Sequence, residues 1–133
     1  MEWKYVKPLC SEELIAEYEA LVSYRLPEAF KECVRKYNGG RPSNRSFDTD
    51  KSQERSLKSF LSFNKGDRET VWKTADCMSK RTLQLYVPFA SDNFGNLICF
   101  DKQNDSVVFL DHESRGKETA APDFRSFMEA LYE

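Results

Sequence analysis

The sequence is short of the residues that most catalytic and metal sites require. It holds one histidine, His112, in 133 residues, and its four cysteines form no C-x-x-C pair. A Ser-His-Asp or Cys-His site would have to use that one histidine, and a zinc site needs three or four ligands. No G-x-S-x-G segment, phosphate-binding glycine loop or calcium-binding loop is present. We therefore expect no catalytic residue, no metal and no cofactor.

Long apolar runs, abundant glycine or proline and a strong charge bias are also missing. Nothing approaches 18 apolar residues in a row, and no apolar segment follows Lys4 and Lys7, so we expect neither a membrane span nor a signal peptide. The cysteines are then expected to be free thiols in the cytoplasm. Five glycines and five prolines exclude collagen-like and linker-like chains. A formal net charge of −2 lacks the basic excess of a nucleic-acid binder, so no direct nucleic-acid contact is expected.

The sequence is, by contrast, rich in apolar and aromatic residues. Hydrophobic residues make up 40% of it, with ten Phe and six Tyr, which excludes a disordered chain. We expect residues 1–133 to form a single domain. Residues 1–82 hold 16 Lys and Arg against 13 Asp and Glu, whereas residues 83–133 hold 4 against 9. The acidic C-terminal part is either a solvated surface or a docking face for a basic partner.

Two helices are predicted near the start of the chain. Ser11 can cap the first, and Pro27 begins the second, since a proline in the first turn loses no needed hydrogen bond. Asn38-Gly39-Gly40 ends the second helix, and we expect at least one of its glycines to have a positive φ. The first helix has five apolar positions on one face: Leu14, Ile15, Tyr18, Leu21 and Val22.

The middle of the chain is predicted to be a polar loop over residues 41–54 with a short edge strand near Phe47. An alternating strand follows over residues 57–63, and a short helix over residues 71–78 is capped by Asp67.

Three strands are predicted next, over residues 83–89, 97–100 and 107–110. The last two are continuous apolar runs, typical of strands that are covered on both faces. Short polar turns between the three make an antiparallel meander. Residues 116–122 are predicted to be a loop, and Asp123 caps a closing helix. Helices followed by a run of strands indicate an α+β fold.

The polar residues at the strand ends allow more than one interpretation. His112 is either a structural residue at a strand end or a partner contact. Two of the carboxylates near the strand ends could form an acid pair for hydrolysis, but carboxylates in turns are usually turn formers. The residues concerned are Asp92, Asp101, Asp105, Asp111 and Glu113. Lys80-Arg81 and the pair Arg41 and Arg45 are interpreted as solvated charge.

Four motifs, spread over residues 14–131, together resemble the SUKH superfamily, named for the fungal Smi/Knr regulators of cell-wall assembly. Leu110 departs from the Trp that many members carry, and Asn96 from a frequent Asp. The motifs are Leu26-Pro27 with Tyr37-Asn38-Gly39-Gly40 after a helix, Val87-Pro88-Phe89-Ala90 with residues 92–101, residues 108–113 around His112, and the pair Phe124 and Phe127.

The resemblance implies a protein-binding domain and not an enzyme. Small bacterial members look like cytoplasmic immunity proteins that bind and neutralise a cognate polymorphic or contact-dependent toxin domain, often a nuclease. Fungal members look like scaffolds or regulators, which is the alternative here. We expect a monomer or weak dimer. The motif residues expected to be structural are Leu26, Pro27, Asn38, Gly39, Gly40, Pro88, Gly95, Asn96 and His112.

The acidic strand ends are the expected toxin contacts, because turn side chains are free to meet another surface. A nuclease needs a basic surface for phosphate, which acidic residues can cover. Asp92, Asp105 and Glu113 are expected to be exposed. The full set of candidates is Asp92, Asn93, Asp101, Asp105, Asp111 and Glu113.

Overall fold

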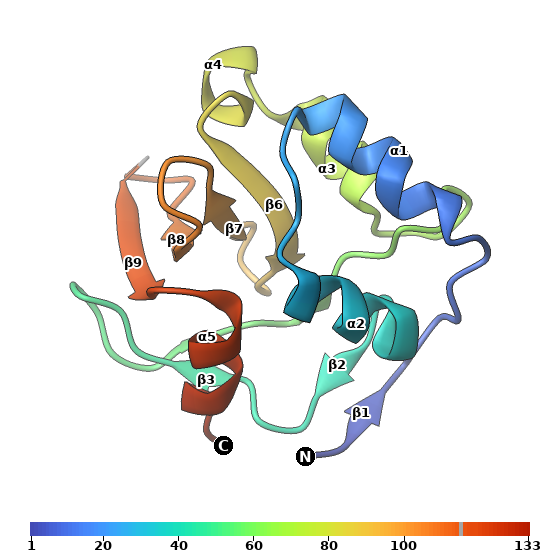
Figure 1. Ribbon diagram of the computed structural model, residues 1–133. Helices are drawn as coiled ribbons and strands as arrows, with labels where there is room; N and C mark the ends of the chain where they lie inside the picture. Colours follow the sequence, from blue (N-terminus) through green and yellow to red (C-terminus); the bar gives the residue numbers. More distant parts are fainter. Residues whose placement is uncertain (115) are drawn as a thin grey trace.

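The computed structural model describes residues 1–114 and 116–133, which form an α+β domain (Figure 1). The helices are α1 (Glu13–Val22), α2 (Glu28–Tyr37), α3 (Val71–Cys77), α4 (Lys80–Leu83) and α5 (Phe124–Ala130). The strands are β1 (Trp3–Lys4), β2 (Arg41–Pro42), β3 (Ser46–Phe47), β4 (Arg55–Ser56), β5 (Ser59–Phe60), β6 (Tyr86–Ser91), β7 (Leu97–Asp101), β8 (Val107–Leu110) and β9 (Lys117–Ala121).

The two N-terminal helices begin and end close to the predicted positions. The Ser11 hydroxyl accepts a hydrogen bond from the Glu13 N–H at 3.2 Å, but the cap residue of α1 is Glu12 and not the predicted Ser11. Pro27 directly precedes α2. After α2 the Gly40 N–H donates to the Tyr37 carbonyl at 2.8 Å, and Gly39 has a φ of +69°. The expected positive φ is thus confirmed, in a turn of type II geometry. The placement of Leu21 on the buried face of α1 is wrong, because its side chain is 56% exposed.

A five-stranded antiparallel sheet in the order β5-β6-β7-β8-β9 forms the framework of the fold. The predicted double burial of the central runs is confirmed: Ile98, Cys99 and Phe100 in β7 are fully buried, as are the first three residues of β8. The predicted meander is therefore present, and the sheet extends it by one strand on each side.

Two predictions about the ends of this sheet are wrong. Residues 117–121, expected to be a loop, form β9 and pair with β8 through Val108 and Thr119. The strand expected to begin at residue 83 begins at Tyr86 instead. Residues 80–83 form α4, because the Ser79 hydroxyl accepts from the Thr82 N–H at 3.1 Å and caps it.

The segment between α2 and α3 departs furthest from the alternating pattern. The edge strand near Phe47 is confirmed as β3, which pairs with β4. Residues 57–63 hold only the short strand β5, and residues 60–63 are all buried, because neighbours cover the segment on both sides. Thr70, not Asp67, caps α3 and accepts from the Lys73 N–H at 3.1 Å. Asp67 instead accepts from the Ser62 hydroxyl at 2.6 Å.

An aromatic core holds the helices to the sheet. Phe30 of α2 is 5.2 Å from Phe89, 5.1 Å from Phe100 and 5.2 Å from Phe124, measured between ring centroids. These rings belong to β6, β7 and α5, and α2 and α5 contact each other (Figure 1). Large aromatic side chains contribute most of the apolar area in such a core.

Candidate functional site

One hydrogen-bond network shapes the turn between β6 and β7. The Asp92 carboxylate accepts from the N–H groups of Phe94 and Asn96 and from the Asn96 side-chain amide, each at 2.8 Å. Gly95 completes the turn with a φ of +88°. Asp92 is only 8% exposed, so the expectation that it is exposed is wrong. Its carboxylate points into its own turn because three donors converge there.

The same network joins this turn to the one after β8. The Asn96 side-chain oxygen accepts from the His112 N–H at 2.9 Å and lies 2.7 Å from His112 Nδ1. A Cβ on Gly95 would lie 3.5 Å from His112 Cε1, so the ring packs over the glycine. The His112 backbone and ring thus link two turns across a separation of sixteen residues.

These bonds present four exposed side chains together at one end of the sheet. Phe94, at the tip of the first turn, is 73% exposed. We call this group the turn surface; its members are Asn93, Phe94, His112 and Glu113. An aromatic ring on a rigid turn loses little conformational entropy on binding, which is typical of interface anchors. Phe94 was not among the contact residues expected from the sequence, because those were chosen for their acidic and amide side chains.

The other acidic candidates are separated from the turn surface or are engaged in bonds. Asp101 and Asp105 belong to the β7–β8 turn, at the opposite end of the strands. Asp101 is 5% exposed, accepts from the Gln103 N–H and pairs with Lys117 at 3.5 Å. Asp105 is exposed and accepts from the Tyr24 hydroxyl at 2.6 Å. Burial of that hydroxyl and its bond to Asp105 raise the pKa of Tyr24.

Asp111 lies beside the turn surface and is half-buried. Its carboxylate accepts from the N–H groups of Glu113 and Ser114, at 2.9 and 3.3 Å, and these bonds hold its pKa below the usual range. The bonds shape the second turn, and Glu113 follows on an exposed position. Of the six acidic and amide candidates, Asn93, Asp105 and Glu113 are exposed.

The N-terminal motif residues are anchored in the interior. The Asn38 side-chain amide donates to the Lys7 carbonyl at 2.7 Å and to Ser62 at 3.0 Å, and its oxygen accepts from the Phe63 N–H at 2.9 Å. Gly40 is needed because a Cβ there would lie 2.8 Å from the Tyr37 carbonyl oxygen. Leu26 is buried in the core, and the half-buried Pro27 starts α2.

The second motif is anchored in the same way. Pro88 is buried in β6, and its carbonyl accepts from the Tyr18 hydroxyl of α1 at 2.9 Å.

An ion pair between the half-buried Arg55 and the buried Glu118, which the sequence did not suggest, fixes β9 to the rest of the fold. Arg55 Nη2 lies 2.8 Å from the Glu118 carboxylate, and the Arg55 guanidinium stacks 4.4 Å above the Phe109 ring. Thr49 and Ser52 donate to the same carboxylate at 2.7 and 3.2 Å. The Arg55 bonds, together with these two, lower the pKa of Glu118. Such a cluster is stabilising only when every partner is present.

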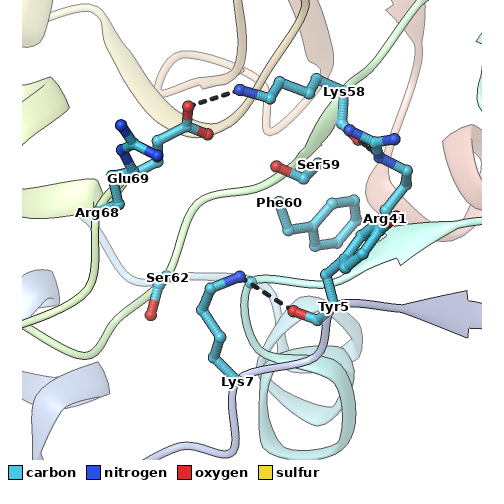
Figure 2. Close-up of a pocket in the computed structure, with 10 residues that line it drawn as sticks. Tyr5, Lys7, Arg41, Lys58, Ser59, Phe60, Ser62, Arg68 and Glu69 are labelled. Carbon is cyan, nitrogen blue, oxygen red and sulfur yellow. Dashed lines mark hydrogen bonds and ion pairs between the residues drawn. The ribbon is translucent and has the colours of Figure 1, made fainter.

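A basic groove lies on the N-terminal side of the molecule. Figure 2 shows its first hollow, of about 450 Å³, with Lys58, Arg68 and Glu69 at one side and Tyr5 and Lys7 at the other. A second hollow of about 610 Å³ shares Lys58, Arg68 and Glu69 with the first, so the two lie side by side and together are called the basic groove. The second hollow extends to Asn93 and Gly95, next to the turn surface.

The described residues were also inspected for metal ligands and for a membrane-spanning helix. Among residues 1–114 and 116–133, no group of three His, Cys, Asp or Glu side chains could hold a metal ion. None of the helices described is long and apolar enough to cross a membrane.

Comparison with known proteins identifies the family. No curated protein matches the sequence. A family model described as SUKH_6, SMI1-KNR4 cell-wall, matches residues 12–128. The match covers most of the sequence, including the motifs that fix both turns, and the chain belongs to the SUKH family.

Proposed function

We propose that this protein is an immunity protein, which binds a cognate toxin domain and neutralises it without catalysis. The observation that carries the proposal is the family match over residues 12–128, since the SUKH family includes immunity proteins of toxin systems. The protein would act in the cytoplasm of the toxin-producing cell.

The turn surface is the part of the molecule best suited to meet the toxin. Phe94 supplies an exposed aromatic anchor, and the Asp92 network holds the backbone of the turn that carries it. A preorganised anchor strengthens binding because less conformational freedom is lost. Asn93 and Glu113 surround it with polar groups, as at the rim of a protein interface.

Neutralisation by binding alone accords with the environment of the one histidine. His112 Nδ1 lies against Asn96, within the network that holds the turns. We therefore expect purified protein to show no hydrolase or nuclease activity. Turnover that His112→Ala abolishes would contradict this part of the proposal.

Co-expression tests the assignment directly. The protein is produced together with the C-terminal toxin domain encoded by the neighbouring gene, and growth and complex formation are scored. We expect full protection and a stable complex, with Phe94→Ala weakening both. Glu129→Gln, an exposed residue of α5, is the matched control. Growth arrest despite soluble protein would overturn the immunity function.

Charge steering provides a second test, which concerns long-range attraction and not one docking face, because Asp105 lies at the opposite end of the strands from the turn surface. Asp105 and Glu113 are exposed carboxylates, and rim charges act mainly on the association rate. We propose that they attract a basic toxin surface. Asp105→Lys with Glu113→Lys should then slow association and flatten its dependence on salt, because screening shortens the reach of charges to about 3 Å at 1 M salt. An unchanged rate at low salt would remove steering by these residues while leaving the immunity function intact.

The description of the family also favours one alternative, a scaffold or regulator of the SMI1-KNR4 type. The two functions differ in genomic setting, since an immunity gene should follow a toxin gene. Retrieval of an endogenous regulatory partner, without a toxin gene nearby, would favour the scaffold.

A further inference from the structure

We propose that the basic groove binds an extended acidic segment of a partner protein, with its carboxylates against Arg41, Lys58 and Arg68. The inference rests on the proposed function only in taking the ligand to be a protein chain. It adds a second contact region beside the turn surface and predicts that the partner segment which binds there is acidic.

The charges of the groove are only partly neutralised by the fold. Lys58 pairs with Glu69 at 2.6 Å, and this is the one ion pair between groove residues in the part of the chain that the structure describes. Arg68 is exposed and has no ion pair there. Arg41 uses Nε to donate to the Lys58 carbonyl at 2.9 Å, which fixes the guanidinium while leaving its remaining N–H groups available. A fixed guanidinium is well suited to a carboxylate.

Tyr5 provides a second, independent observation at the same place. It has a φ of +59°, a conformation that is unfavourable for a residue with a side chain, and its ring is 65% exposed. The Arg41 guanidinium lies 5.3 Å from the ring centroid, and Lys7 Nζ donates to the Tyr5 carbonyl at 3.0 Å (Figure 2). A strained, exposed aromatic residue beside a cleft is typical of binding sites.

The surroundings favour carboxylates over nucleic acid. Glu69 places a negative charge inside the groove. A continuous phosphate backbone would bring a phosphate against Glu69, whereas side chains alternate in direction along an extended peptide, so that the carboxylates on one side can meet Arg41 and Arg68. Because the second hollow ends at Asn93, a segment in the groove would lead directly to the turn surface.

A peptide-binding experiment with the purified full-length chain tests the inference. The probe is a fluorescein-labelled eight-residue peptide of alternating Glu and Asp. Its binding is measured by fluorescence anisotropy. Labelled controls are a peptide of alternating Gln and Asn and an eight-nucleotide oligothymidylate. We expect the acidic peptide alone to bind and added salt to weaken it. In an NMR titration the backbone signals of Ser59, Ser62 and Glu69 should shift.

Three variants make the result specific to the groove. Arg41→Gln with Arg68→Gln should weaken binding about tenfold, as expected for the loss of two charged contacts. Lys80→Gln with Arg81→Gln removes the same charge from exposed positions on α4, outside the groove, and should change binding less than about twofold. Tyr5→Gly should weaken binding while raising the unfolding temperature, since glycine relieves the strained φ. A purely structural Tyr5 would not change both in this way.

Several results would overturn the proposal. These are a dissociation constant for the acidic peptide above roughly 1 mM, equal binding by both variant pairs, or NMR shifts confined to another face. Stronger binding of the oligothymidylate would assign the groove to nucleic acid instead. None of these results depends on the toxin, so the co-expression experiment judges the immunity function separately.

Discussion

The acidic turns of the C-terminal part and the basic residues of the groove differ in how far the fold itself uses their charge. Asp92 and Asp101 are buried and accept hydrogen bonds within their own turns, and Glu118 is paired with Arg55. In the groove, Arg68 is exposed and has no ion pair among the described residues. The charge balance along the sequence draws attention to the acidic end, but many acidic side chains there are structural. A charged side chain is available to a binding partner only where no other group of the fold already pairs with it.

The largest expected effect comes from the most heavily bonded acidic residue. Asp92→Ala removes the acceptor of three hydrogen bonds and leaves the Asn96 amide unsatisfied. We expect the free energy of unfolding to fall by about 3 kcal/mol in urea denaturation. Glu113→Ala, an exposed acid of the neighbouring turn, should change it by less than about 0.5 kcal/mol. Equal losses in the two variants would break the distinction between structural and available carboxylates.

Glu118→Gln tests whether the buried carboxylate acts through its charge. Its pKa lies below the ordinary value of 4.5, so the ionised form stabilises the fold above pH 4.5 and this contribution fades as the pH falls through the lowered pKa. We expect a loss of about 2 kcal/mol at pH 7, measured by urea denaturation. The difference from the unmodified protein should shrink as the solution is acidified. Glu129→Gln, on the exposed side of α5, is the control, and a loss that does not vary with pH would contradict the charge argument.

A smaller effect is expected in the turn that forms one wall of the groove. Gly39 has a φ of +69°, and a Cβ there would lie 3.4 Å from Ser62 Cβ. Gly39→Ala should therefore lower the free energy of unfolding by about 1 kcal/mol. Gly66 has nothing within 4 Å of a built Cβ, and Gly66→Ala should be neutral or slightly stabilising. Thermal unfolding of both variants tests whether the loss is specific to the turn at Gly39.

The smallest stability effect is expected at the groove itself. Arg68→Gln should change the free energy of unfolding by less than about 0.5 kcal/mol, because Arg68 forms no ion pair within residues 1–114 and 116–133. Arg55→Gln, which removes the partner of Glu118, should be clearly destabilising. Thermal unfolding of this pair sharpens the comparison between a basic residue that the fold needs and one that it leaves free. An equal fall in the unfolding temperature of both variants would show that the groove arginine is also structural.

Local sequence patterns determined the parts of the fold that depend on neighbouring residues. Backbone preferences and periodicity explain the Asp123 cap of α5, the proline before α2, the positive φ of Gly39 and the two buried apolar runs. The family motifs likewise predicted an α+β domain. The joint position of Gly95, Asn96 and His112, however, follows only from the pairing of β7 with β8.

Tertiary structure decided the features in which distant residues meet. Residues 117–121 look like a loop because they are polar, yet they form β9, since β8 offers an open edge and Arg55 neutralises Glu118. Tyr5, Arg41, Lys58 and Arg68 are far apart in the sequence, and only the packing of the N-terminal segment against β2 and β5 brings them to one groove. The sequence alone determined which charges and turns exist. Long-range packing decided which of those charges are buried with partners and which remain exposed, because burial depends on contacts that no local pattern encodes.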